Sequence, residues 1–271
     1  KNGVFYNQSN AINVCEDGGG GNGTDGLCFI PPNAYLNVIP GEKLLQLNDV
    51  YTVEIHSLNK SSYEYMIQLS TQLNNTGTVQ VQTGTVNLSG GGSSSGTFQA
   101  DIGATLAFGG GNHTLTAGLL TGNGIIAISG ANVTVSSAIV RDLNNLTLSS
   151  GTLGLNGTTA SETDNLTQTG GTLTGTGELV VAATNGIFNW SGGTQSGTGK
   201  TTLKGTSTLS GSTKYLDTRT IENQSNVTWT SGDIYASNGA VWNNTATGVF
   251  DIQGNNGFYQ NVGSQPKLNN A

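Results

Sequence analysis

The acidic side chains of this chain are too scattered to build an obvious catalytic centre. Hydrolysis of a polysaccharide needs two carboxylates on either side of the scissile bond, and lyase chemistry adds a Lys, Arg or His base. In the C-terminal two-thirds only Glu162 with Asp164, and Asp217 with Glu222, lie close together. Neither pair has a partner on the same strand face that the sequence identifies. We therefore expect no enzyme activity, no metal and no cofactor.

The basic and imidazole side chains lead to the same expectation. His56 and His113 are isolated, and His113 takes an inward position in its repeat, as a core or corner residue would. Arg219 follows Asp217 closely, which reads as a surface ion pair. With nine Lys and Arg against sixteen Asp and Glu, the chain has a net charge of -7 and lacks the basic stripe that nucleic acid requires.

A different chemistry is better represented, because Asn-x-Ser/Thr recurs through the chain. This tripeptide is the acceptor for N-glycosylation. It occurs roughly twice as often as the Asn, Ser and Thr content alone would give. The fourteen candidate acceptors are Asn7, Asn22, Asn59, Asn74, Asn87, Asn112, Asn132, Asn145, Asn156, Asn165, Asn189, Asn223, Asn226 and Asn243.

Five of these acceptors open a repeated unit that reads Asn-hydrophobic-Thr-hydrophobic-Thr/Ser, with His113 replacing the first hydrophobic residue in one copy. The unit recurs about every twenty residues, and a fixed period of this length is the signature of a solenoid. Stacked copies predict a single outward ladder of Asn and Thr. One step, from Asn132 to Asn145, is only thirteen residues, so one coil is short or one copy is out of register. The copies begin at Asn112, Asn132, Asn145, Asn165 and Asn226.

Composition and alternation predict the architecture that positions these residues. Gly (42 residues), Thr, Ser and Asn disfavour helices, and alternation of apolar and polar residues predicts strands with one face inward. Three short strands and Gly-containing corners account for each coil of an all-β, parallel β-helix with about 20 residues per coil. The residues expected to face inward include Leu115, Val133, Val135, Leu146, Leu148, Leu166, Trp190, Val227, Trp229, Leu120, Val140, Leu153, Leu173, Ile234, Ile126, Ile128, Leu179, Val181 and Leu203.

The outward face of Asn and Thr allows three interpretations. Thr suits a pleated surface and stacked Asn side chains bond one another, which would be purely structural. The Asn residues could instead carry glycans that solvate a rod with few charges. A flat Thr-x-Thr array could also bind ice or another crystal surface, although this needs regular, bare rows.

The N-terminal segment differs in composition from the repeats. It contains Cys15 and Cys28 in a Gly-rich loop, and in an extracellular chain we expect them to form a disulfide. The chain opens at Lys1 without a signal peptide, as a mature or trimmed secreted product would. We predict an N-terminal segment and cap over residues 1–72, a solenoid over 73–262 and a polar tail over 263–271. No run of eighteen apolar residues exists, so no membrane insertion is expected.

The units Gly171–Leu179 and Asn145–Leu153 resemble the β-strand repeats of bacterial surface adhesins and autotransporter passengers. The resemblance implies a right-handed parallel β-helix with an N-terminal cap or head, displayed extracellularly at the cell surface, with a role in adhesion or surface structure. A carbohydrate-binding or carbohydrate-active β-helix is the alternative, with surface carbohydrate as a partner.

The ends of such a rod need caps or partners, because an open solenoid exposes strand edges and core. Residues Asn2–Asn7 resemble Asn185–Trp190 and Thr247–Asp251, so they read as a stray solenoid strand. We hypothesise that Gly3, Val4, Phe5 and Tyr6 add to the open end of another copy, giving a head-to-tail homopolymer. Packing within the chain's own cap is the alternative.

Overall fold

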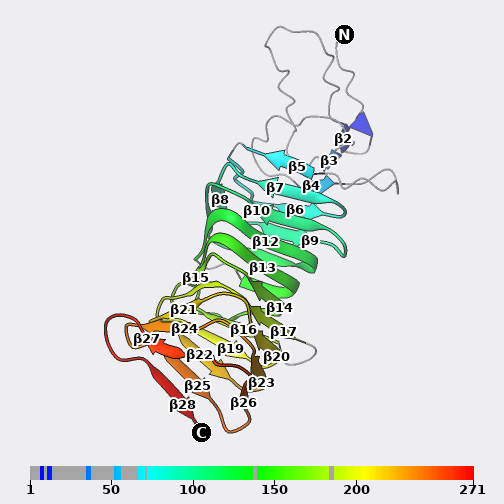
Figure 1. The fold of residues 1–271 in the computed structure, drawn as a ribbon. Coiled ribbons are helices and arrows are strands. Elements are labelled where there is room, and N and C mark those ends of the chain that lie inside the picture. Colours follow the sequence, from blue (N-terminus) through cyan, green and yellow to red (C-terminus); the bar gives the residue numbers. More distant parts are fainter. Residues whose placement is uncertain are drawn as a thin grey trace.

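The chain folds as a parallel β-solenoid, as its repeat predicts (Figure 1). The computed structural model describes residues 7–8, 11–13, 35–37, 52–55, 66–70, 72–136, 139–182 and 186–271. In these ranges every regular element is a strand, and the strands stack in about 9 turns of about 20 residues. No helix capable of crossing a membrane occurs in the described part of the chain.

Each coil contains three strands, one on each of three faces of the solenoid, which we call the first, second and third face. Along the chain a coil passes through the third face, then the first, then the second. Strands one coil apart therefore lie side by side in parallel (Figure 1). The long strands β12 (Leu119–Val135) and β13 (Ile139–Leu155) run through all three faces, and β14 (Ser161–Gln168) runs through the third and first. Besides these segments, the first face contains β5 (Met66–Leu69), β7 (Thr85–Leu88), β10 (Thr105–Phe108), β17 (Ile187–Trp190), β20 (Thr206–Leu209), β23 (Asn226–Trp229) and β26 (Val249–Ile252).

The other two faces are built in the same way. The second face contains β8 (Gly92–Ser94), β11 (Asn112–Leu115), β15 (Thr172–Thr174), β18 (Gly193–Gln195), β21 (Lys214–Asp217), β24 (Ile234–Ser237) and β27 (Phe258–Gln260). The third face contains β2 (Ala11–Asn13), β3 (Tyr35–Asn37), β4 (Thr52–Ile55), β6 (Thr78–Val81), β9 (Thr97–Ala100), β16 (Glu178–Val181), β19 (Lys200–Leu203), β22 (Thr220–Asn223), β25 (Val241–Asn244) and β28 (Lys267–Asn270).

The interior is a mainly apolar column, interrupted by buried polar side chains such as Gln168 and Gln195, and it confirms the inward set predicted from the alternation. All of those residues are buried, and Trp190, Trp229 and Trp242 are among the largest fully buried side chains. The predicted inward position of His113 is also confirmed. Stacked coils therefore bury large aromatic side chains in a core that continues along the axis.

Glycine is required at the corners between faces. Gly122 and Gly175 open two of the Gly-x-Gly steps of the sequence and have φ of 113° and 107°. A Cβ added to either would lie 2.1 Å from a carbonyl oxygen of the coil below, that of Ala100 or Leu155. L-residues rarely adopt such φ values and could not fit that close approach, so these positions admit only Gly.

The prediction of one Asn ladder is wrong, because the repeated unit occupies two faces. Asn112 and Asn132 pair on the second face, where Thr152 follows them. Asn145 instead pairs with Ile125 and Asn165 on the first face. The thirteen-residue step is thus the passage from the second face of one coil to the first face of the next, through the third.

The described strands at the two ends extend the predicted limits of the solenoid. β5 and β4 pair with β7 and β6, so solenoid pairing reaches into residues 1–72. β28 pairs with β25 and places a strand within the segment 263–271 that was expected to be a polar tail. At the N-terminal end, β1 (Asn7–Gln8) pairs antiparallel with β2 of its own chain.

Candidate functional site

The last coil forms an open edge at the C-terminal end of the solenoid. β26, β27 and β28 each pair with the strand one coil earlier, and no other described strand pairs with their outer edges (Figure 1). Three parallel backbone edges therefore face the same axial direction. Unpaired edges of this kind are templates for the addition of a further strand.

The apolar core continues into this edge, and no described residue covers it. Ile252 is 50% exposed, whereas Trp229, one coil earlier in the same inward column, is 1% exposed. Leu268 is 42% exposed above the fully buried Trp242. Val249, on the outward side of β26, is also exposed. The end of the rod thus displays side chains whose equivalents elsewhere are core residues.

Two ordered stacks lie directly below the open edge. The ring of Phe250 lies 4.8 Å from that of Trp242 and 5.7 Å from that of Trp229, nearly parallel to both. At the third-face corner, Asn223 Nδ2 donates to Asn244 Oδ1 (2.7 Å), and Asn244 Nδ2 donates to Asn270 Oδ1 (2.6 Å). These contacts hold the last coil in register with the coil before it. The backbone edge is therefore already in the conformation that a further strand would need.

The acceptor Asn residues differ widely in exposure. Asn223 is fully buried and its Nδ2 is occupied by Asn244 and by the carbonyl of Val249, so a glycan there is incompatible with this packing. The exposed acceptors are Asn74, Asn112, Asn132, Asn156, Asn189 and Asn226, and the half-buried ones are Asn87, Asn145, Asn165 and Asn243. The side chains of Asn7, Asn22 and Asn59 lie outside the described residues, as do Cys15, Cys28, Gly3, Val4, Phe5 and Tyr6.

Neighbouring Asn side chains also bond along the axis. Asn132 Nδ2 donates to Asn112 Oδ1 (3.0 Å), and Asn165 Nδ2 donates to Asn145 Oδ1 (3.2 Å). This matches the structural interpretation of the ladder and leaves glycosylation untested. The Thr rows are interrupted, by Asn189 in one column and by Gly154 in another, so the described strands form no long, flat Thr array.

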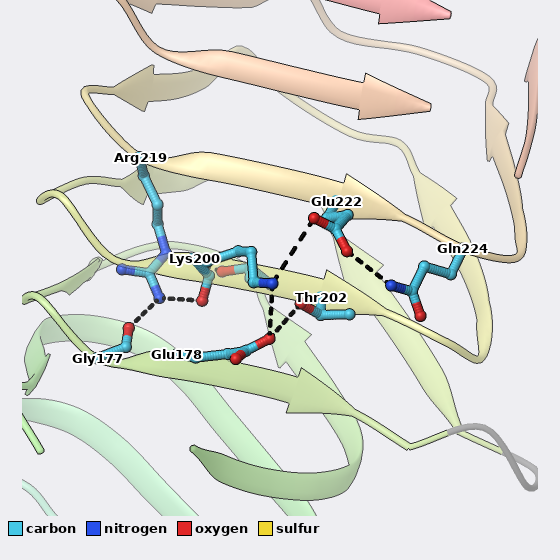
Figure 2. Close-up of polar contacts among 8 residues, drawn as sticks. Gly177, Glu178, Lys200, Thr202, Arg219, Glu222 and Gln224 are labelled. Atoms are coloured by element: carbon cyan, nitrogen blue, oxygen red, sulfur yellow. Dashed lines mark hydrogen bonds and ion pairs between the residues drawn. The ribbon is translucent and has the colours of Figure 1, made fainter. Parts of the chain in front are cut away.

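The third face brings together charged residues that the sequence left apart (Figure 2). Lys200 Nζ lies 3.3 Å from Glu178 Oε1 and 3.6 Å from Glu222 Oε2, which joins three consecutive coils. Thr202 Oγ1 donates to Glu178 Oε1 (2.5 Å), and Gln224 Nε2 donates to Glu222 Oε1 (2.6 Å). No spacing in the sequence indicated this cluster, because its charged members Glu178, Lys200 and Glu222 come from β16, β19 and β22.

The electrostatics of this cluster suit a surface clamp better than acid–base chemistry. Burial alone would raise the pKa of the Glu178 carboxyl, but the Thr202 hydroxyl and the Lys200 ammonium outweigh it and hold that pKa below its ordinary value. A general acid needs a raised pKa at neutral pH. The groups are also partly exposed, so each ion pair contributes about 0–1 kcal/mol.

The prediction that Arg219 forms a surface pair with Asp217 is wrong. Arg219 is fully buried, and its guanidinium donates to Thr201 Oγ1 and to the carbonyls of Gly177 and Lys200 (Figure 2). Burial lowers its pKa to about 10, and the charge of Glu178 opposes that shift. The Arg219 side chain points inward, so its guanidinium donates to backbone carbonyls at a corner and does not form an ion pair with Asp217 at the surface.

Two further ionisable groups are buried. Lys214 Nζ donates to the carbonyls of Ser210, Ser212 and Ser231 at 2.7, 3.0 and 3.0 Å. Burial lowers the Lys214 pKa to about 8, against the raising effect of Asp233. Burial likewise lowers the pKa of His113, whose Nε2 lies 3.0 Å from the Gly110 carbonyl oxygen. Lys214 is thus enclosed by the corners of two consecutive coils, and His113 by a corner of its own coil.

The candidate carboxylates are not brought together into a metal centre. Within the described ranges no three His, Cys, Asp or Glu residues are grouped as a metal ion would need. The absence of enzyme activity stays a prediction. No protein family, curated protein or solved structure matches this chain.

Proposed function

We propose that this chain is a non-enzymatic, extracellular structural subunit that joins head to tail with other copies into a glycosylated surface fibre or an adhesin shaft. The observation that carries the proposal is the open last coil, where core side chains and three strand edges are left uncovered. An uncovered edge of this kind is a template on which a strand from a partner can add.

The occupant that fits the first-face edge is the segment Gly3–Tyr6 of a second copy. Its sequence Gly-Val-Phe matches Gly248-Val249-Phe250 at the edge itself, and resembles Gly186-Ile187-Phe188 deeper in the same face. In that register Phe5 would continue the inward column of Phe250, and Val4 would lie outward beside Val249. A strand from another copy would then satisfy the edge in the way that β-strand addition does.

The free energy gained at the first-face edge alone is too small to hold two copies together. Burying the exposed halves of Ile252 and Leu268 contributes about 1 kcal/mol each, since full burial of such a side chain is worth about 1.5–3 kcal/mol. A stable fibre therefore needs the other two edges to be covered as well. Because the contact joins different surfaces of the two copies, it does not close and it propagates into a filament.

Glycans fit this proposal as the solvating layer. The rod has few charges of its own, and six acceptor Asn residues are exposed along its sides. The adhesin-like identity rests on the repeat units Gly171–Leu179 and Asn145–Leu153 and on the shared solenoid architecture.

The deciding experiment compares Ile252→Lys with Ile102→Lys by electron microscopy and sedimentation velocity. Ile252 is half-exposed, so Lys is tolerated in the monomer, but at a coil-to-coil contact it would bury an unpaired charge. Ile102 is 82% exposed in a turn away from the edge and serves as the matched control. We expect fibres from the unmodified chain and from Ile102→Lys, and monomers from Ile252→Lys.

Deleting residues 1–8 separates the proposed occupant from other partners. We expect the deleted chain to stay monomeric. Fibres from the deleted chain would exclude the N-terminal strand as the occupant, and fibres from Ile252→Lys would exclude the open edge altogether.

A further inference from the structure

A ladder of three tyrosines lies on the outward side of the second face. Tyr215 pairs with Tyr235, and Tyr235 pairs with Tyr259, in three consecutive coils. Their ring centroids are 6.2 and 5.4 Å apart, with the rings tilted by 36° and 45°. Tyr215 is 44% exposed and Tyr259 is 47% exposed. The solenoid therefore presents a row of aromatic rings to solvent, parallel to its axis.

The position of these rings is not a consequence of general composition. In the preceding coils the same outward column contains Asn112, Asn132, Thr152, Thr172 and Thr194. Every Tyr after residue 65 lies in this one column, and all three Trp of the chain point inward. The fold does not require aromatic residues at these positions, because Asn and Thr occupy the same column in the preceding coils.

Polar groups with a strained backbone border the ladder. Asp217 lies two residues after Tyr215 on the same outward side, and its Oδ1 accepts hydrogen bonds from Asn238 Nδ2 (2.7 Å) and Thr218 Oγ1 (3.0 Å). Thr218 and Asn238 have φ of 64° and 52°. A positive φ is unusual for a β-branched residue, and such strain concentrates at binding sites. The strained turn at Thr218 and the neighbouring turn at Asn238 hold a carboxylate and an amide at the edge of the aromatic row.

We propose that Tyr215, Tyr235 and Tyr259, with Asp217 and Asn238, bind a neutral polysaccharide that lies along the axis of the rod. The faces of β-linked pyranoses carry C–H groups that pack against the negative face of an aromatic ring. Hydroxyl groups at the rim of each sugar find acceptors and donors in Asp217 and Asn238. A ladder with one ring per coil suits a linear ligand with repeating units.

Charge and surface composition favour this ligand over an acidic polysaccharide or another protein. The chain has a net charge of -7, and Asp217 borders the row, so polyanions are repelled. A protein interface has an apolar centre around its aromatic anchors. Here the aliphatic residues of β21 and β24, Leu216, Ile234 and Ala236, are all buried, so these two strands offer rings and polar groups, and the exposed Val262 lies beyond the end of β27.

The test is affinity electrophoresis of the full chain in gels containing hydroxyethyl cellulose, laminarin or galactomannan, with alginate as the acidic comparison. We expect retardation by at least one neutral polysaccharide, little dependence on salt, and none by alginate. Tyr235→Ala should weaken binding about tenfold, because it removes the central ring, whereas Tyr235→Phe should retain it. Thr172→Ala, in the same column but outside the ladder, is the matched control and should bind normally.

Several outcomes would overturn the proposal. These are no retardation by any of the three neutral polysaccharides, equal binding by Tyr235→Ala, or binding to alginate alone. If Tyr235→Ala instead abolishes a self-association seen by sedimentation, the ladder is a contact between copies and not a saccharide site. Monomeric Ile252→Lys should still bind the polysaccharide, so failure of this site and failure of head-to-tail assembly are distinguishable.

Discussion

Replacing Trp242 by Ala should unfold the C-terminal coils while leaving the rest of the rod intact. Trp242 is fully buried in β25, and its ring stacks on Phe250, which in turn stacks on Trp229. Truncating a buried Trp to Ala costs about 3–5 kcal/mol, from lost burial and the cavity that remains. The lost stacking of Phe250 falls within that range.

The solenoid determines where this loss is felt. Each coil contacts only its neighbours, so stability is close to a sum of coil and interface contributions. At Trp242 a single coil lies on the C-terminal side, and that coil has no described strand beyond it to hold it in place. The loss of about 3–5 kcal/mol falls on this terminal contact, so the last coil should open locally before the rest of the rod unfolds.

Hydrogen exchange followed by mass spectrometry tests this reasoning. We expect peptides covering β25 to β28 to lose protection, while peptides covering β10 to β14 keep it. Trp190→Ala is the matched control, because Trp190 is equally buried but has several coils on either side. A uniform loss of protection in Trp242→Ala would refute nearest-neighbour stability, and unchanged protection in β25 to β28 would refute the role of the aromatic stack.

Three other predictions follow from the buried and exposed side chains. Burial lowers the pKa of His113 below 6.5, so as the pH falls the unfolded chain binds a proton at this residue before the folded chain does. The free energy of unfolding should therefore fall as the pH drops below about 6.5. In urea denaturation at a series of pH values, His113→Leu should flatten this part of the profile. Lys214 has a pKa of about 8 in the folded chain and 10.5 in the unfolded chain, so the unfolded chain binds more protons between these pH values. The free energy of unfolding should therefore rise with pH over that window, by up to about 3 kcal/mol. Lys214→Met should abolish the rise. Glycopeptide mass spectrometry of the native protein should find glycans at Asn112 or Asn132 and none at Asn223; because adjacent coils are about 4.8 Å apart, simultaneous occupancy of Asn112 and Asn132 would count against the stacked geometry.

The repeat determined the fold before any coordinates. Alternation of apolar and polar residues fixes which side chains point inward in a strand, because successive Cβ atoms point to opposite faces. The inward positions of His113, Trp190 and Trp229 follow from that rule alone. Gly-containing corners were likewise predicted, since a tight turn needs a φ that only Gly adopts easily, and Gly122 and Gly175 occupy two of them.

Only the tertiary structure decided how coils register against one another. Asn132 and Asn145 carry the same motif but lie on different faces, because the motif specifies a strand and not the face that the strand joins. For the same reason the sequence did not predict the Tyr215–Tyr235–Tyr259 ladder or the contact of Lys200 with Glu178 and Glu222. In both, neighbouring residues are about one coil apart in the sequence. Coil lengths vary with the corners, so residues that stack in space are not equally spaced in sequence. Which side chains meet along the axis is therefore a property of the assembled solenoid, and the candidate sites of this protein are built from those meetings.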